Sequence, residues 1–309
     1  MDLKNKRILV TGGAGFLGSF VVEQLEKLSA RVVVFRSRDF DLTKQERCAR
    51  VFRYEYDIVI HLAGRVGGIG LNKAKPAELF YNNILMGINV LEASLFANVK
   101  KFVLIGTVCS YPKNTPVPFK EEDLWSGYPE ETNAPYGIAK KALFEMARAY
   151  RQQYGFNAIC LLPVNLYGPK DHFEPEKSHV IPALIKKVAD AQKNGQDFIE
   201  VWGTGLASRE FLYVEDAAEA IVLATQHYDK AAPVNIGAGF EITIRELVWK
   251  ICQTMDFKGE VRWDLTKPDG QPRRCLDVLR AEKEFGFKAK TGFDEGLEKT
   301  IQWYLRSNA

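Results

Sequence analysis

Five short apolar runs in the first half of the chain are separated by longer segments with helical periodicity. The runs are RILVTG, RVVVF, DIVIHLAG, KFVLIGT and AICLLPV, which begin at residues 7, 31, 57, 101 and 158. Strands that are buried on both faces of a parallel sheet read as nearly continuous Val, Ile and Leu. The alternation of such runs with helices predicts βαβ units and an α/β fold, with a Rossmann-type, doubly wound parallel sheet.

The regular alternation is lost after residue 165. The stretch NLYGPKDHFEPEKSHVIP is rich in turn formers and polar groups, and helical periodicity returns near IPALIKKVADAQ. We therefore predict a main domain over residues 1–165 and a smaller C-terminal, mainly substrate-binding lobe over 166–309, with segments near 210–240 completing the sheet. Ligands of open α/β sheets bind at the carboxyl ends of the strands, here in the crevice facing that lobe.

Composition and charge argue against several classes of protein. The chain has 309 residues, no apolar run of the ~18 residues that cross a membrane and no apolar signal segment at its start, so we expect a cytoplasmic protein. A net charge of +3 with scattered basic residues argues against a nucleic-acid partner. The five cysteines include no CxxC pair, so neither a disulfide framework nor a metal site is expected.

A glycine-rich turn follows the first apolar run. In TGGAGFLGSFVVEQL, Gly12, Gly15 and Gly18 open an amphipathic helix. Such glycines allow a tight turn, a close backbone approach to a pyrophosphate at the helix N-terminus, and close packing of helix on strand. A purely structural turn is the alternative, but the position between strand and helix favours dinucleotide binding by residues 1–165.

The end of the second run, RVVVFRSRDFDL, bears on which dinucleotide is bound. Sites selective for NAD usually place an acidic residue here for the adenosine ribose. Arg36 and Arg38 instead favour NADP, because both can face a 2′-phosphate. Two alternatives stay open: the arginines simply solvate the strand end, or Asp39 or Asp41 holds the ribose.

Tyr136 and Lys140 stand four residues apart in PYGIAKK, so they share one face of the helix predicted there. A lysine beside a phenol is expected to lower the phenol pKa, which suits acid/base chemistry on a carbonyl group. Thr107, at the end of the fourth run, is placed to hydrogen-bond the same carbonyl oxygen. These residues predict a Thr-Tyr-Lys carbonyl site.

Longer strings give the chain a resemblance to the extended short-chain dehydrogenase/reductase family, and within it to enzymes that epimerise and reduce GDP-4-keto-6-deoxy-mannose. The resemblance covers nearly the whole chain. It rests on HLAGRVGGIGLN, CSYPK, NAPYGIAK, LPVNLYGPKDHF, SHVIPALIKK, WGTGLASREFLYVED, TIREL and KPDGQPRRCLDV.

The resemblance implies roles for individual residues. Tyr136 and Lys140 would be the acid/base pair of the reduction, with Thr107 beside them, and Cys109 and His179 would move protons at C3 and C5 of the sugar. The implied cofactor positions are Gly12, Gly15, Phe16, Leu17, Gly18, Arg36, Arg38, Asp41, Leu42, Leu62, Ala63, Gly64, Ile105, Gly106, Lys140, Pro163, Asn165, Leu166 and His179, and those for the nucleotide-sugar are Asn165, Lys187, Trp202, Arg209 and Asp269.

The thiol and imidazole also make chemical sense on their own. A ketone at C4 acidifies the hydrogens at C3 and C5, and inversion needs a base on one face and an acid on the other. Cys109 and His179 are such groups, although a buried strand-end thiol and a capping histidine are the simpler interpretations. His61, inside DIVIHLAG, reads as a satisfied core histidine.

Three positions depart from the family pattern: Ala14 replaces an arginine of the glycine loop, Val108 a serine and Lys187 an arginine. Lysine cannot grip a diphosphate in the bidentate way that arginine can. An epimerase-only or reductase-only enzyme for another nucleotide-linked deoxysugar or heptose is therefore the main alternative, ahead of a dehydratase or a non-enzymatic dinucleotide sensor. A homodimer is expected through the apolar helices near 82–97 and 135–150.

Overall fold

The computed structural model describes residues 1–174, 178–267 and 269–308. Its main sheet has six parallel strands in the order β10-β5-β4-β3-β1-β2. The strands are β1 (Arg7–Thr11), β2 (Arg31–Val33), β3 (Ile58–His61), β4 (Lys101–Ile105), β5 (Ala158–Pro163) and β10 (Val234–Ile236). The predicted α/β fold and its five apolar strands are confirmed, and the late segment near 234 adds the sixth strand.

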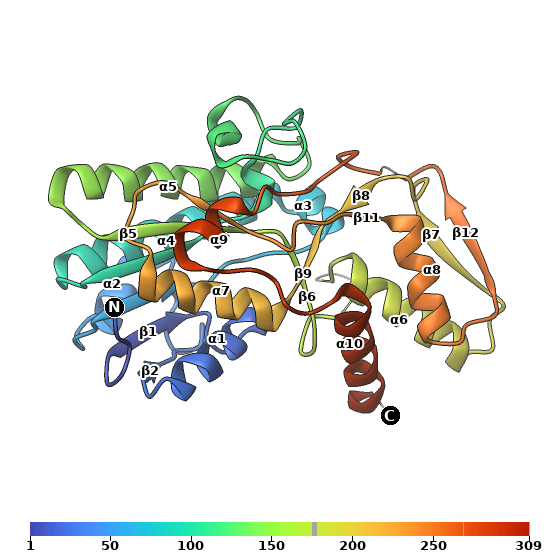
Figure 1. The fold of residues 1–309 in the computed structure, drawn as a ribbon, viewed down its shortest axis with the longest axis horizontal. Coiled ribbons are helices and arrows are strands. Elements are labelled where there is room, and N and C mark those ends of the chain that lie inside the picture. Colours follow the sequence, from blue (N-terminus) through green and yellow to red (C-terminus); the bar gives the residue numbers. More distant parts are fainter. Residues whose placement is uncertain (175–177, 268, 309) are drawn as a thin grey trace.

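Helices cover both faces of this sheet (Figure 1). The helices α1 (Phe16–Lys27) and α7 (Val214–His227) pack together on one face, with α9 (Leu279–Phe285) beside α7. The other face carries the paired long helices α4 (Pro76–Phe96) and α5 (Ala134–Tyr154), with α2 (Gln45–Val51) against α4. This double covering explains why the strands read as continuous apolar runs.

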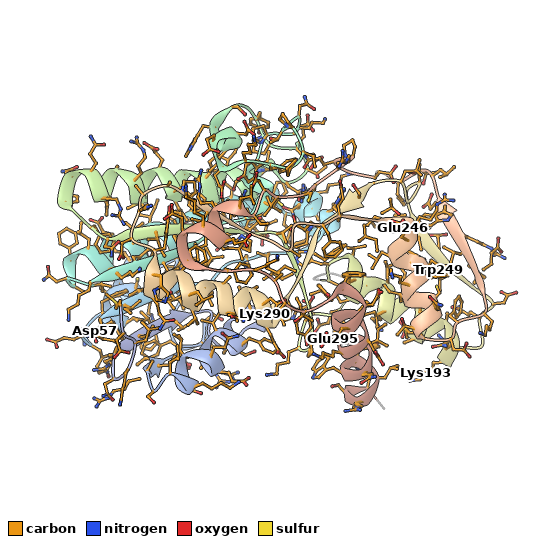
Figure 2. The ribbon with its side chains drawn as sticks, viewed as in Figure 1. Asp57, Lys193, Glu246, Trp249, Lys290 and Glu295 are labelled. Atoms are coloured by element: carbon orange, nitrogen blue, oxygen red, sulfur yellow. The ribbon has the colours of Figure 1, made fainter. Side chains whose placement is uncertain are left out.

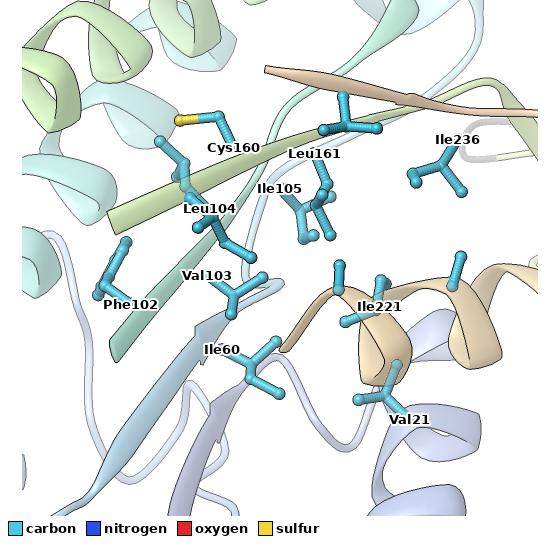
Figure 3. Close-up of a cluster of buried hydrophobic side chains, with 14 of the residues drawn as sticks. Val21, Ile60, Phe102, Val103, Leu104, Ile105, Cys160, Leu161, Ile221 and Ile236 are labelled. Atoms are coloured by element: carbon cyan, nitrogen blue, oxygen red, sulfur yellow. The ribbon is translucent and has the colours of Figure 1, made fainter. Parts of the chain in front are cut away.

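The core between these layers is formed by aliphatic side chains of the central strands and the facing helices. Figure 3 shows Val103 and Ile105 of β4, Leu161 of β5, and Ile221 of α7 in this cluster, all buried. Since each buried aliphatic side chain contributes about 1.5–3 kcal/mol relative to exposure, the cluster holds the strand ends in place. Those ends carry the candidate site.

The second lobe has its own core, and its described residues form three helices and three pairs of short strands. The helices are α6 (Val180–Lys193), α8 (Ile244–Thr254) and α10 (Phe293–Ser307). The pairs are β6 (Asn165–Tyr167) with β9 (Phe211–Tyr213), β7 (Phe198–Trp202) with β12 (Glu260–Asp264), and β8 (Ser208–Arg209) with β11 (Ile242–Thr243). Glu246, labelled on α8 in Figure 2, completes a capping box with Thr243 and fixes the start of that helix.

One expectation about the later segments is corrected. We expected segments near 210–240 to complete the main sheet; β10 does so, and α7 covers one face of it. The strand β9 does not, because it pairs with β6, which continues the chain beyond β5 and away from the main sheet.

The connections add a short helix α3 (Ile69–Ala74) and two 3₁₀ turns, Val108–Ser110 and Glu121–Trp125. Within the described residues, no helix combines the length and the apolar character needed to span a membrane. The same residues contain no group of three or more His, Cys, Asp or Glu side chains arranged to hold a metal ion.

Candidate functional site

A cavity of about 960 Å³ opens at the carboxyl ends of β1, β3, β4 and β5. All five predicted catalytic residues and every predicted cofactor position line it, and one of these positions, Asn165, is also a predicted substrate position. Ala14 and Val108, two of the departures from the family pattern, also line it, and the other lining positions were not singled out from the sequence: Leu9, Thr11, Phe35, Ser37, Phe40, Thr43, Val51, Arg65, Val66, Gly67, Asn72, Asn82, Met86, Asn133, Val164, Asp171 and His172. Its size suits a dinucleotide or a nucleotide-sugar.

The glycine turn forms one end of the cavity and fits a pyrophosphate. Gly12 has φ +73°, and a Cβ there would lie 2.8 Å from the Ala63 nitrogen, so a side chain is excluded. A Cβ on Gly18 would strike the carbonyl of Gly12, so helix and turn pack closely. The first turn of α1 contains no acidic residue, which leaves its positive end available to an anion.

The loop after β2 offers cations at the same end. Arg36 and Arg38 are exposed on the cavity wall, and the Arg38 guanidinium lies 3.7 Å from the Asp39 carboxylate. The Asp41 carboxylate accepts hydrogen bonds from the backbone nitrogen and hydroxyl of Thr43, at 3.0 and 2.7 Å, and the hydroxyl bond in particular lowers its pKa. Asp41 is thus engaged within its own turn, and the loop fits an additional phosphate better than a bare ribose.

Tyr136 and Lys140 lie on the first turns of α5, facing the end of β4. The Lys140 amine donates a hydrogen bond to the Ile105 carbonyl at 3.1 Å, and burial lowers its pKa to about 8. Burial also raises the pKa of Tyr136, Cys109 adds to the rise, and a hydrogen bond with Thr107 opposes it. The expectation that Lys140 lowers the phenol pKa is therefore wrong here, because burial dominates and the amine is engaged with the Ile105 carbonyl.

A short turn after β4 brings the thiol to the phenol. The Thr107 hydroxyl accepts a hydrogen bond from the Cys109 backbone nitrogen at 3.2 Å and so caps the 3₁₀ turn Val108–Ser110. The Ser110 hydroxyl donates to the Gly137 carbonyl at 3.0 Å. Gly137 has no room for a Cβ against Cys109, so the turn lies directly on α5. This packing gathers Thr107, Cys109 and Tyr136 in one wall of the cavity.

Arg274 reaches the same thiol from the far end of the sequence. Its Nη1 lies 3.5 Å from the sulfur of Cys109, and the residue is 6% exposed. The string KPDGQPRRCLDV contains Arg274, but nothing in it distinguishes this arginine from Arg273. The contact is visible only in the folded chain.

His179 is the N-cap residue of α6 and faces the cavity from the second lobe. Its surface is open to the cavity, yet protein atoms surround the imidazole, and this burial lowers its pKa, with His172 adding to the effect. Nearby Asp171 is 7% exposed, and its Oδ1 accepts a hydrogen bond from the His172 nitrogen at 2.7 Å. Its Oδ2 has no hydrogen-bond partner among the described residues, and burial raises its pKa to about 7.

Four predicted substrate positions do not line the cavity. The Arg209 guanidinium donates to the carbonyls of Ser208, Gln271 and Asp269 at 2.7, 2.5 and 3.0 Å. The Asp269 carboxylate accepts from the nitrogen and hydroxyl of Thr204 at 2.7 and 2.8 Å. Both residues therefore hold turns of the second lobe.

Lys187 and Trp202 form a separate pair on this lobe. The Lys187 amine donates to the Glu200 carbonyl at 2.8 Å and lies 6.0 Å from the centre of the Trp202 ring. Half of the Trp202 surface is exposed. Their predicted contact with a nucleotide-sugar stays a prediction.

Glu210 fixes two loops beside the site. It is completely buried, and its carboxylate accepts from the backbone nitrogens of Ala238, Gly239 and Leu276 at 2.6, 2.7 and 2.6 Å. Burial raises its pKa to about 6, against the effect of these bonds. The segment that carries Arg274 is thereby held against the main domain.

His61 lies at the end of β3, below the cavity, and is fully buried. Its Nδ1 is 2.8 Å from the Thr11 hydroxyl, while Nε2 has no partner among the described residues. Burial, with the Lys140 charge, lowers its pKa to about 3. It is a neutral core histidine, as expected. Only one of its two ring nitrogens has a hydrogen-bond partner among the described residues, whereas we expected both to have one.

Comparison with known proteins shows the family of the chain. Residues 8–237 match the model of the NAD dependent epimerase/dehydratase family. The chain belongs to this family. A curated relative, the GDP-L-fucose synthase of Sinorhizobium fredii, is 39% identical over 308 residues, which cover 99% of this chain and 98% of the relative.

Two solved structures share the fold over almost the whole chain. A GDP-6-OMe-4-keto-L-xylo-heptose reductase from C. jejuni superimposes with a TM-score of 0.92 at 30% identity, over 98% of this chain and 99% of the other. A GDP-L-fucose synthetase from Naegleria fowleri, bound to NADP, gives a TM-score of 0.88 at 29% identity, over 99% and 95%. The family membership confirms the resemblance stated from the sequence.

Proposed function

We propose that this protein is an NADP-dependent epimerase/reductase that converts GDP-4-keto-6-deoxy-D-mannose to GDP-L-fucose. One observation carries the proposal: a single cavity brings together the Thr107, Tyr136 and Lys140 set, the Cys109 and His179 pair, and the glycine turn. The first set suits reduction of a ketone, and the pair suits proton exchange beside that ketone. The names of the relatives support the GDP-linked substrate.

The cofactor is held by the main domain. The turn at Gly12–Gly18 and the N-terminus of α1 would hold the pyrophosphate, and Arg36 and Arg38, on the wall of the same cavity, would hold the 2′-phosphate. When bound, reduced NADP supplies the hydride that C4 of the sugar accepts. Pro163, Asn165 and Leu166 line the same cavity and would enclose the nicotinamide.

Epimerisation precedes reduction because it depends on the C4 ketone. Cys109 and His179 exchange protons with C3 and C5, one group removing a proton and the other returning one to the opposite face. The C4 oxygen gains negative charge at this stage. The hydroxyls of Thr107 and Tyr136 stabilise that charge by hydrogen bonding.

Reduction ends the reaction, with Tyr136 protonating the C4 oxygen. Because burial raises the pKa of the Tyr136 phenol, the phenol stays protonated at neutral pH and is ready to act as this acid. Lys140, one helical turn further along α5, returns a proton to the phenol during turnover; its pKa of about 8 allows proton exchange at neutral pH. On the second lobe, Lys187 and Trp202 meet the GDP portion, and Arg209 and Asp269 shape the turn beside it.

A reductase that acts on a GDP-linked 4-keto-heptose is the second candidate. The high structural similarity to the C. jejuni reductase favours it. Incubation of the protein with GDP-4-keto-6-deoxy-D-mannose and NADPH, followed by NMR of the product, separates the two. GDP-L-fucose supports the main proposal, a reduced sugar with unchanged C3 and C5 supports a reductase, and no turnover counts against the assigned substrate.

The protein is further proposed to act in the cytoplasm as a homodimer. A reducing compartment keeps the Cys109 thiol free. The helices α4 and α5 lie side by side (Figure 1) and expose the large apolar side chains of Phe80, Tyr81, Phe96 and Tyr154. Pairing of this surface across a two-fold axis would cover it. A monomer in solution scattering at micromolar concentration would count against the dimer.

A further inference from the structure

Two consecutive arginines, Arg273 and Arg274, have side chains in different environments. Arg273 is exposed and forms an ion pair with the Glu241 carboxylate. Arg274 is buried, and its Nη1 lies 3.5 Å from the sulfur of Cys109. The first arginine is a surface ion-pair partner, whereas the second brings a positive charge to the thiol of the proposed active site.

The Arg274 guanidinium is held in a fixed position. Its Nε and Nη2 donate to the Gln271 side-chain carbonyl at 3.2 and 3.1 Å. Gln271 is itself buried and donates to the Lys113 carbonyl at 2.8 Å, while its backbone carbonyl accepts from Arg209. The Cys109 sulfur therefore faces a rigid donor rather than a mobile side chain.

No carboxylate among the described residues pairs with Arg274. Nearby acidic groups are engaged elsewhere: Glu210 with three backbone nitrogens, Asp269 with Thr204, and Glu130 with Thr132 and Asn133. A buried charge without a counter-charge is costly, and buried cations are normally paired. The group placed to supply the missing negative charge is the thiol of Cys109.

We propose that Arg274 is a positioning residue that holds Cys109 as a thiolate and so makes Cys109 the base of the epimerisation. This inference rests on the proposed function for the sugar chemistry, but the state of the thiol does not depend on substrate. An opposite charge within hydrogen-bond distance favours the ionised form of an acid.

The proton balance of the step is complete. The thiolate takes a proton from C3 or C5, and the electron pair of that C–H bond becomes the enolate, with its charge on the C4 oxygen. His179 takes up a proton from solvent and delivers it to the opposite face of the carbon, and the charge on the oxygen is lost. The Cys109 thiol then releases its proton to solvent, so both groups return to their starting states without any oxidation or reduction.

Other titratable groups around Cys109 are compatible with a thiolate. From β8, Arg209 adds a second cation, because its pKa falls only to about 10 on burial. From α5, the Tyr136 phenol is neutral at pH 7 since burial raises its pKa, and the Lys140 amine, with a pKa near 8, carries partial positive charge. His179 faces the cavity from α6. None of these groups brings a negative charge.

The test is the pH dependence of alkylation of Cys109 by iodoacetamide in the full chain without substrate, measured by mass spectrometry of the Cys109 peptide. Arg274→Gln should slow alkylation at pH 7 about tenfold and move its midpoint upward by a unit or more. Arg274→Lys should slow alkylation less than Arg274→Gln does, because it keeps the charge but loses the two bonds to Gln271 that fix the guanidinium. Arg273→Gln, the matched control, should behave as the parent. An Arg274→Gln profile equal to the parent's overturns the proposal.

A second measurement needs no Arg274 variant. The difference in thiolate absorbance between the parent and Cys109→Ser, followed against pH, should show a midpoint below the ~8.5 of a free thiol. A midpoint at or above that value overturns the proposal. The two hypotheses also fail separately: a lowered thiol midpoint without sugar turnover contradicts the proposed function alone, and sugar turnover with an ordinary thiol midpoint contradicts the role of Arg274 alone.

Discussion

The amine of Lys140 donates a hydrogen bond to the backbone carbonyl of Ile105, 3.1 Å away, and thereby ties α5 to the end of β4. This bond helps to fix the position of α5 along the direction of β4. Tyr136, one turn earlier on α5, is consequently held beside Thr107, which follows β4 by two residues. The acid of the proposed reduction is positioned by backbone geometry before any substrate arrives.

Replacing Tyr136 by Phe should separate reduction from epimerisation. Removal of the hydroxyl should slow NADPH oxidation with GDP-4-keto-6-deoxy-D-mannose by roughly 10²- to 10⁴-fold, the usual effect of a positioned acid. Deuterium exchange at C3 and C5 should partly persist, because Cys109 and His179 are intact. Single-turnover absorbance and NMR in deuterated water measure the two steps, and an equal loss of both would contradict the assignment.

Replacing Cys109 by Ser should do the reverse. A serine hydroxyl is far too weak an acid to cycle a proton near pH 7, so deuterium incorporation at C3 and C5 should be largely lost. NADPH oxidation should continue slowly and give a wrongly configured or partly epimerised sugar. Cys252→Ser on α8, outside the cavity, is the control. If Cys109→Ser incorporates deuterium as fast as the parent, the thiol is a packing residue.

Arg38→Glu should erase or reverse a preference for NADPH over NADH. The change removes a cation from the cavity wall and places a negative charge against the 2′-phosphate, while NADH lacks that group. Affinities for both cofactors can be measured by fluorescence titration. Arg31→Glu, at the opposite end of β2, should leave the ratio unchanged. Equal affinity of the parent for both cofactors would contradict this prediction.

Asp171→Asn should change how stability depends on pH. The folded pKa of this carboxyl is raised to about 7 from 3.8, so the folded state binds the proton more tightly than the unfolded state. The parent therefore loses stability as pH rises from about 4 to 7, and Asn, which does not titrate, avoids this loss. The gain from Asn should be small near pH 4 and reach a few kcal/mol above pH 7.

Urea unfolding of both proteins at pH 4.5 and 8 measures this difference. Asp197→Asn removes the same charge from an exposed position, so its difference in unfolding free energy from the parent should be similar at the two pH values. If the stability difference between Asp171→Asn and the parent does not grow with pH, the Asp171 carboxyl does not have the raised pKa that its burial implies.

The structural features that the sequence predicts best are those that depend on residues close together in the chain. The strands β1 to β5 are continuous apolar runs, and both the turn at Gly12 and the pair Tyr136 and Lys140 depend on spacings within one turn or one helix. Each such pattern has one main physical meaning, namely burial on two faces, close backbone approach, or a shared helix face. For that reason the glycine turn and the pair on α5 could be predicted from local spacing, whereas lining positions such as Phe35, Asn72 and Met86 carry no such pattern and were not predicted.

Long-range contacts could not be predicted in this way. Arg274 meets Cys109 across 165 positions, and a string such as QPRRC does not tell which arginine faces inward. Arg209 donates to the backbone carbonyl of Asp269, and the Asp269 carboxylate accepts from Thr204. Both side chains are therefore engaged within the second lobe and do not line the cavity. The raised pKa of Tyr136 depends on how deeply α5 is buried, and spacing along a helix carries no information about depth.

The carboxylate of Glu210 also determines where this chain tolerates added length. This one carboxylate accepts hydrogen bonds from the backbone nitrogens of Ala238, Gly239 and Leu276. A residue inserted in either loop would move at least one of these nitrogens away, and the buried carboxylate would lose that hydrogen bond. The turn at Gly195 is different, because no atom lies within 4 Å of where a Cβ would stand. A tag or a peptide epitope spliced in at Gly195 should fold with the chain, whereas the same splice at Gly239 should not.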